Sequence, residues 1–302
     1  METLNNIVLT IQNYMSNYVL IIALLGAGLW FSFRLGFIQV RGFGEGMKRT
    51  FGGLFSKKGE AGADGMSSFQ ALATAIAAQV GTGNIAGAAT ALAIGGPGAI
   101  FWMWIAAFLG MATIYAEAIM AQKYKTVGAD GQVTGGPVYY IRAAFKGTFG
   151  KVLAGIFAIL ITLALGFMGN AVQSNSIAAS FHTAFGIPQW IMGLVVAVIA
   201  IFVFMGGMKR IAKVTETIVP FMAALYIVGS LIVIIYNYKN IPYAFASIFI
   251  GAFSPSSVVG GAAGATVKLA LTKGVARGLF SNEAGMGSTP HAHAVAKVDH
   301  PV

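Results

Sequence analysis

The feature that most constrains this chain is the apolar segment 67–94, which is long enough to span a bilayer but is interrupted at its centre. The interruption reads Gln79-Val80-Gly81-Thr82-Gly83-Asn84. Inside a helix, each glycine costs about 1 kcal/mol relative to alanine. Backbone groups released at membrane depth are tolerated only where they face protein or a watery cavity. We therefore predict a broken membrane helix, non-helical over 79–84, whose backbone lines a binding cavity as in many transporters.

The overall composition is that of a membrane protein. Of the 302 residues, 57% are hydrophobic and 9% are charged, whereas soluble domains carry about 25% charged residues. The mean hydropathy is +0.77. The net charge of +10 does not indicate a nucleic-acid partner, because the basic residues lie in short loops between apolar segments. The chain has no cysteine, which excludes disulfides and thiolate metal sites.

We expect an all-α polytopic membrane protein with a single transmembrane domain over residues 1–302. The spanning segments are expected at 17–34, 67–94 (broken), 97–123, 151–180, 187–207, 214–236 and 257–285 (also broken). The apolar segment 241–253 is short and is followed by Pro255. We expect it to lie at the membrane surface or to cap the outer mouth.

The distribution of basic residues predicts the orientation. They gather in three loops: Arg34, Arg41, Lys48, Arg49, Lys57 and Lys58; Lys123, Lys125, Arg142, Lys146 and Lys151; Lys209, Arg210 and Lys213. The loops on the opposite side carry only Lys239. Loops next to spans hold most Lys and Arg on the cytoplasmic side. We therefore expect a multi-pass protein of the cell membrane with an external N-terminus and with loops 35–66, 124–150 and 208–213 in the cytoplasm.

Several motifs resemble those of one transporter family. They are Phe37-Ile38-Gln39, Gly81-Thr82-Gly83-Asn84, Gly95-Gly96-Pro97 followed by Trp102-Met103-Trp104, Gly135-Gly136-Pro137 with Tyr139-Tyr140, and the run from Arg277 to Gly285. In this order they closely resemble the signature of the sodium:alanine symporters, also called the alanine or glycine:cation symporter family. The resemblance covers essentially the whole chain.

This resemblance implies the inverted-repeat fold of the bacterial leucine transporter. Segment 17–34 would be an extra N-terminal helix, 67–236 a complete first repeat, and 257–285 the first helix of the second repeat. Symmetry with 67–94 then implies a break near Thr272-Lys273-Gly274. Such symporters are longer than this chain, so the resemblance also implies a C-terminal truncation and a 302-residue chain that does not transport by itself.

The chemistry of the first break suits a small zwitterion. The helix that begins after it offers N–H groups and a positive dipole end to a carboxylate. The helix that ends before it offers carbonyls to Na⁺ or to an ammonium group. The predicted substrate ligands are Gln79, Gly81, Thr82, Gly83 and Asn84, with Na⁺ near the backbone of Ala78 and Gly81. The alternative is that both glycines only allow close helix packing.

Two further sets of residues are candidates for the site. Phe167, Asn170 and Gln173 belong to a polar patch in segment 151–180 that could place an aromatic lid and amides beside the substrate. The alternative is that this patch marks the outer end of a helix, where amides meet water. The implied second break adds Thr272 and Gly274.

The function expected from these patterns is Na⁺-coupled import of a small neutral amino acid, alanine or glycine. An enzyme is not expected, because no H-E-x-x-H, no catalytic G-x-S-x-G and no Walker loop is present. No cofactor is expected, and Na⁺ serves only as the coupling ion. Coupling to H⁺ remains an alternative, as do a channel and a non-transporting membrane fragment or scaffold.

The orientation can be tested by cysteine labelling. Lys57→Cys should react with a membrane-impermeant maleimide only after cells are permeabilised, because loop 35–66 is expected inside. The chain has no native cysteine, so the label reports this position alone. Lys239→Cys is the matched control and should react in intact cells. Labelling of position 57 in intact cells would overturn the orientation.

Overall fold

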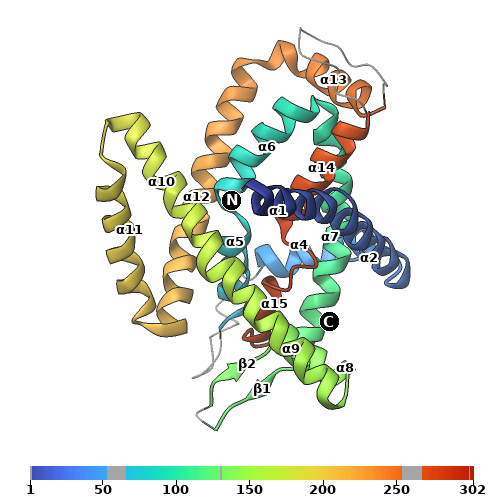
Figure 1. The fold of residues 1–302 in the computed structure, drawn as a ribbon, viewed down its shortest axis with the longest axis vertical. Coiled ribbons are helices and arrows are strands. Elements are labelled where there is room, and N and C mark those ends of the chain that lie inside the picture. The colour runs from blue at the N-terminus through green and yellow to red at the C-terminus, as the bar shows by residue number, and fades with distance from the viewer. Residues whose placement is uncertain (1, 53–65, 130, 254–266, 299) are drawn as a thin grey trace. The chain divides into compact units, whose positions relative to one another are not determined.

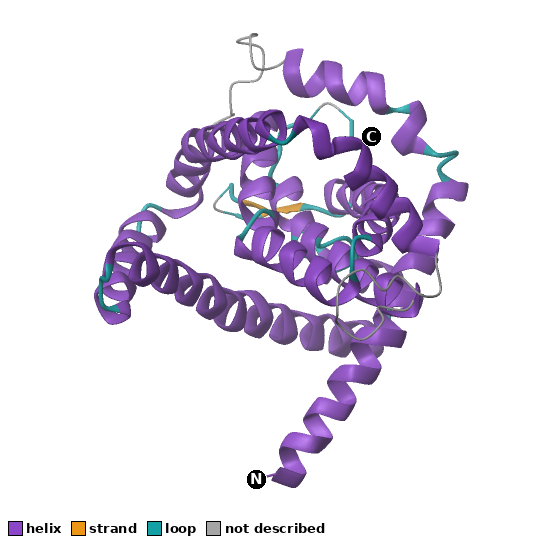
Figure 2. Ribbon diagram, turned by 90° about the horizontal axis from the view of Figure 1, so that it is seen from above, coloured by secondary structure: helices purple, strands orange, loops and turns teal. Residues whose placement is uncertain are grey.

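The computed structural model describes residues 2–52, 66–129, 131–253, 267–298 and 300–302 (Figure 1). These residues are helical or in loops, except for one small antiparallel sheet, Thr126–Val127 (β1) with Val133–Thr134 (β2) (Figure 2). Residues 53–65 of the first basic loop and 257–266 of the last expected span lie outside the described residues.

The chain forms two compact units. Unit 1 comprises Met1–Gly46, Gly83–Ala116 and Leu225–Met286, and unit 2 comprises Met47–Thr82, Glu117–Ala224 and Gly287–Val302. The chain passes between the units after Gly46, Thr82, Ala116, Ala224 and Met286. We describe each unit separately.

Unit 1 contains the N-terminal helices and the helices that follow the first break. Its elements, wholly or mostly, are α1 (Glu2–Tyr14), η1 (Met15–Val19), α2 (Leu20–Arg34), α3 (Ile38–Arg41), α6 (Thr82–Gly95), α7 (Gly98–Lys123), η3 (Tyr238–Asn240), α13 (Ile241–Phe253) and α14 (Val267–Asn282). Its core joins Ile21 of α2, Ala106 of α7, and Val275 and Leu279 of α14. Burial of these side chains positions the C-terminal end of α14.

The implied break near Thr272-Lys273-Gly274 is wrong, because these residues lie inside the continuous helix α14. The glycine has a packing role there instead. A Cβ on Gly274 would overlap the carbonyl oxygen of Ala99 in α7, and one on Gly278 would lie 2.8 Å from the Cβ of Ala106. Small residues four apart let two membrane helices approach closely. The backbone of α14 therefore stays helical where it meets α7.

Unit 2 contains the helix before the first break and a long apolar rod. Its elements, wholly or mostly, are α4 (Phe43–Gly52), α5 (Ser68–Gln79), β1, β2, α8 (Pro137–Ala144), α9 (Gly147–Ile161), η2 (Thr162–Gly169), α10 (Asn170–Phe185), α11 (Gln189–Phe204), α12 (Gly207–Tyr236) and α15 (Thr289–Ala294). The rod α9–η2–α10 ends at Gly186, whose φ of 70° gives a left-handed C-cap. The chain then returns as α11 beside α10 (Figure 1).

The start of α5 is set by a capping box. The Ser67 hydroxyl accepts the Gln70 N–H, and the Gln70 side chain accepts the Ser67 N–H, both at 3.1 Å. Reciprocal caps of this kind satisfy two N–H groups that have no partner within the helix. Gln70 also donates to Glu216 of α12 at 3.0 Å. These contacts fix the register of the helix that leads into the first break.

Three stretches among the described residues are long and apolar enough to cross a membrane: Gly98–Lys123, Gly147–Phe185 and Gly207–Tyr236. Two shorter apolar helices are Leu20–Arg34 and Gln189–Phe204. Segment 241–253 forms the 13-residue helix α13. These helices agree with an all-α membrane protein. The inverted repeat of the leucine-transporter type and the limits of each span remain predictions.

The packing role of Gly274 can be tested by one methyl group. Gly274→Ala should lower the free energy of unfolding by about 1–3 kcal/mol, because the methyl overlaps backbone that cannot move aside. Gly229→Ala in α12 is the matched control, since nothing lies within 4 Å of its Cβ position. It should instead stabilise by up to about 1 kcal/mol through helix propensity. Thermal unfolding in detergent measures both, and equal shifts would contradict the packing role.

Candidate substrate site at two helix breaks

The first break is short. Helix α5 ends at Gln79 and α6 begins at Thr82, so only Val80 and Gly81 lie outside helices. Val80 has extended backbone angles, φ −95° and ψ 96°. The prediction that all of 79–84 is non-helical was therefore too wide. The first turn of a helix already presents N–H groups without partners in that helix, so exposing them requires no further unwinding.

Gln173 of α10 lies directly on this break. Its Oε1 accepts the Thr82 N–H at 3.1 Å and the Thr82 hydroxyl at 2.9 Å. A Cβ on Gly81 would overlap the side-chain amide of Gln173. Gly81 is thus required for the close approach of a polar side chain, and not for helix packing. All three residues belong to unit 2.

A second break follows α14. The helix ends at Asn282, Glu283 has a φ of 55°, and Gly285 and Gly287 have φ values of 83° and 75°. Asn282 Oδ1 accepts the N–H of Ala284 at 3.0 Å. Helix α15 begins at Thr289. Left-handed backbone is easily adopted only by glycine, which explains two glycines in this turn.

In unit 2 the two breaks bring α5 and α15 together. Gln79 Nε2 donates to the Thr289 hydroxyl at 2.8 Å, and Thr289 is almost completely buried. At the other end of α15, Gln122 Nε2 donates to the carbonyls of His293 and Ala296, the latter at 2.9 Å. The carbonyls at the end of this short helix are therefore satisfied by a side chain.

Burial changes the titration of groups around α15. It lowers the pKa of the His293 imidazole and the pKa of the Lys125 ammonium. Burial, and then the negative charge of Glu117, raises the pKa of the Tyr140 phenol. The cause is that burial removes hydration from the charged form of each group. His293 is thus part of a packed element.

In unit 1 the corresponding helix ends also meet. Asn84 Nδ2 at the start of α6 donates to the carbonyl of Ser281 in α14 at 3.3 Å. One turn further along α6, Gly87 leaves space for the Arg277 side chain, whose Cδ lies 2.7 Å from the Cβ position of Gly87. Among the described residues, Asn282 Nδ2 and Thr113 Oγ1 are buried without a hydrogen-bond partner. Buried polar atoms of this kind call for a ligand or a water molecule.

The other predicted site residues are placed differently. Phe167 is 67% exposed within the π-helical segment η2, and Asn170 of α10 donates to the carbonyl of Gly166 in η2 at 3.0 Å. Thr272 donates to Leu269 within α14 at 3.3 Å. Ala78 is exposed in the last turn of α5. Of the predicted polar patch in α10, the structure brings Gln173 to the break, and roles for Phe167 and Asn170 stay predictions.

Sequence reasoning missed the second break at 283–288, although a signal was present. Gly285 and Gly287 are spaced like Gly81 and Gly83, and an asparagine lies close to each pair. The site near Gly274 has a single glycine and no amide beside it. Paired glycines next to an amide would have located both breaks.

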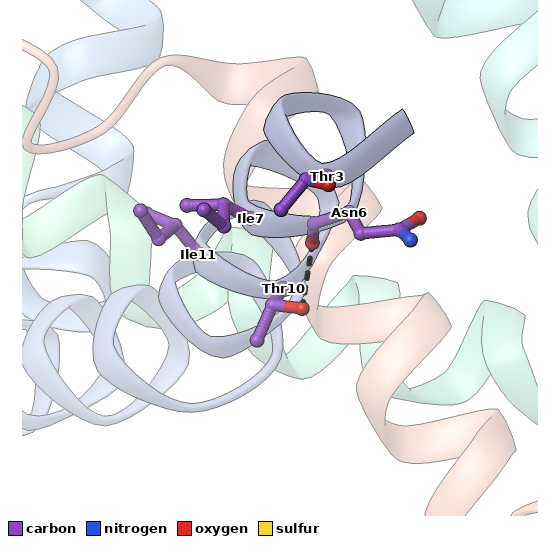
Figure 3. A pocket seen from close by; sticks show the side chains of 5 residues that line it. All are labelled: Thr3, Asn6, Ile7, Thr10 and Ile11. Atoms are coloured by element: carbon purple, nitrogen blue, oxygen red, sulfur yellow. Dashed lines mark hydrogen bonds between the residues drawn. The ribbon is translucent and has the colours of Figure 1, made fainter. Parts of the chain in front are cut away.

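A hollow on α1 of unit 1 does not have the character of a substrate site. A hollow of about 340 Å³ lies along α1 (Figure 3) and is lined by Thr3, Asn6, Ile7, Thr10 and Ile11 of that helix. The Thr10 hydroxyl donates to the Asn6 carbonyl at 2.7 Å. A single helix lines this hollow, so it lacks the convergent groups of a binding site. No group of three or more His, Asp or Glu residues that could hold a metal occurs in the described part of the chain.

Comparison with known proteins now identifies the family. The pattern that defines the sodium:alanine symporter family matches residues 1–302. The chain belongs to this family. Proteins of the family are transporters and not enzymes, in agreement with the expectation from the sequence. The match over residues 1–302 gives no support to the expected C-terminal truncation.

Three relatives with similar sequences carry different names. The chain is 44% identical over 298 residues to the sodium/alanine symporter AgcS of Methanococcus maripaludis, covering 98% of this chain and 64% of the relative. It is 47% identical over 279 residues to the putative sodium/proton-dependent alanine carrier protein YrbD of Bacillus subtilis, covering 92% and 55%. It is 43% identical over 301 residues to the probable sodium/glutamine symporter GlnT of Bacillus subtilis, covering 100% and 60%. The chain thus spans less than two thirds of these relatives.

The contact between Gly81 and Gln173 can be tested by a double-mutant cycle. Gly81→Ala should displace the Gln173 amide from Thr82 and lower the free energy of unfolding by about 1 kcal/mol. In a Gln173→Ala background the same change should cost almost nothing, because the obstructing amide is gone. Unfolding in mixed detergent micelles gives the four free energies. Additive effects would show that Gln173 does not hold the break.

Proposed function

We propose that this protein is a Na⁺-coupled symporter of a small neutral amino acid, with alanine or glycine as substrate. The main support for the proposal is the first break, where the side-chain amide oxygen of Gln173 accepts the first N–H of α6, that of Thr82. Family membership supports cation-coupled amino-acid transport. The identity of the ion and of the amino acid is our inference, because the names of the relatives differ in both. For the ion they give sodium or sodium/proton, and for the amino acid they give alanine or glutamine.

The proposed carboxylate site is the start of α6. Thr82 directs an N–H and a hydroxyl at the same acceptor, Gln173 Oε1. A carboxylate oxygen is a stronger acceptor than an amide oxygen, and the dipole of α6 favours negative charge there. The substrate would therefore replace Gln173 Oε1 on Thr82. Gly81 and Gly83 keep this backbone accessible.

The proposed cation ligands are carbonyl oxygens at the end of α5, near Ala78 and Gly81. The last carbonyls of a helix lack partners within that helix and carry its negative dipole end. Na⁺ prefers such hard oxygen ligands, and neutral ligands avoid burying a net negative charge. A cation next to the substrate carboxylate would stabilise it electrostatically. By linkage, each ligand then raises the affinity of the site for the other.

The second break of unit 1 holds a buried donor that has no hydrogen-bond partner among the described residues. Asn282 Oδ1 is occupied by the Ala284 N–H, which leaves Nδ2 as a buried donor directed toward Gly110 of α7. Gln79 and Asn84 support the site by holding helix ends through Thr289 and Ser281.

Ligand binding tests this proposal. The purified chain should bind radiolabelled alanine or glycine in Na⁺ but not in K⁺, and lowering the pH should not replace Na⁺. Gly83→Leu should abolish binding, because a bulky side chain covers the start of α6. Thr82→Ala, Gln79→Ala and Asn84→Ala should each weaken it by about 1–3 kcal/mol.

Gly26→Leu in α2 is the matched control and should bind normally, since its Cβ position has nothing within 4 Å. Uptake into proteoliposomes driven by a Na⁺ gradient separates a transporter from a non-transporting fragment or scaffold. Unchanged binding in Gly83→Leu would refute the site, and binding driven by protons alone would refute Na⁺ coupling.

A further inference from the structure

A pocket of about 320 Å³ lies between α8 and α9 of unit 2. Its lining residues are Val138, Arg142, Lys151, Ala154, Gly155 and Ala158. The two residues from α8 are four apart, and the four from α9 follow the helical spacing of one face. Basic side chains from both helices therefore lie beside a floor of small apolar residues.

The two basic side chains are unpaired in the part of the chain that the structure describes. Within the described ranges, neither Arg142 nor Lys151 has an ion pair or a side-chain hydrogen bond. The sequence has no acidic residue between Asp130 and Glu216. Positive charge at this pocket is thus available for an anion from outside the protein.

The pocket is formed by a tight corner and not by a loose loop. Gly147 has a φ of 78°, and a Cβ on Gly150 would overlap the carbonyl of Phe145. Phe145 and Phe149 pack edge to face with ring centroids 5.5 Å apart. At the floor, Ala154 is buried and Gly155 has nothing within 4 Å of its Cβ position. The absence of a side chain at Gly155 keeps the pocket open.

The pocket opens onto an apolar helix surface. It lies at the first turns of the Gly147–Phe185 rod, which is apolar enough to cross a membrane and is little buried by protein. Val152, Ile156 and Ile159 on α9 are about half exposed or more, at 54%, 49% and 63%. A ligand that fits here has an anionic group that contacts Arg142 and Lys151 and a hydrocarbon part that contacts the apolar surface of α9.

We propose that this pocket binds the headgroup phosphate of an anionic phospholipid, with an acyl chain along α9. Basic pockets between membrane helices are suited to such headgroups. A free phosphate ion would use the two cations but none of the apolar floor. The lipid therefore accounts for both halves of the lining.

Native mass spectrometry of the purified chain tests the site with phosphatidylglycerol as the probe. The chain should retain phosphatidylglycerol in preference to phosphatidylcholine of the same acyl chains. Arg142→Gln and Lys151→Gln should each lower the apparent affinity for phosphatidylglycerol about fivefold. Lys146→Gln is the charge control, because Lys146 lies in the same corner but does not line the pocket.

Filling the pocket with a larger side chain is an independent test of the lipid site. Gly155→Leu should abolish the preference for phosphatidylglycerol without destabilising the fold, since its side chain enters open space. Gly193→Leu in α11 also enters open space and should bind like the unmodified chain. Thermal unfolding of each variant confirms folding, and the two charge variants decide the matter if Gly155→Leu is unstable.

Three results would overturn the proposal. One is equal retention of phosphatidylglycerol by the unmodified chain and by both charge variants. Another is loss of retention in the Lys146→Gln and Gly193→Leu controls to the same extent. The third is displacement of the lipid by millimolar inorganic phosphate, which would show a simple anion site.

Discussion

Backbone hydrogen bonding is the constraint on which this structure depends. In a chain of this composition, an N–H or carbonyl released at membrane depth has no bulk water to pair with. At the first break the side chain of Gln173 takes the N–H of Thr82, and at the second Asn282 takes the N–H of Ala284. Gln122 does the same for the last carbonyls of α15. Neutral amides hold every one of these helix ends.

The choice of amides over charged groups has a functional consequence. A carboxylate or ammonium group on these breaks would be costly to bury. An amide oxygen satisfies a helix N-terminus only weakly, so a substrate carboxylate can replace it. Gln173 is therefore both a structural cap and, in our proposal, the group that substrate displaces.

Glycine has different physical roles in this chain, and residue identity alone does not separate them. Gly81 lets a side chain approach, Gly285 and Gly287 adopt left-handed backbone, and Gly274 lets α14 pack on α7. The role depends on what lies opposite the missing Cβ. For this reason the break predicted at Gly274 was wrong.

The sequence by itself determined that the chain is an all-α membrane protein of the sodium:alanine symporter family, because composition and local motifs are properties of the chain alone. It also located the first break, since paired glycines beside amides disfavour a helix locally. Only the tertiary structure decided that Gln173 rests on Thr82, that the second break lies at 283–288, and that α15 is packed against α5. These features depend on contacts between residues far apart in sequence. Hydrophobic periodicity does not predict such contacts.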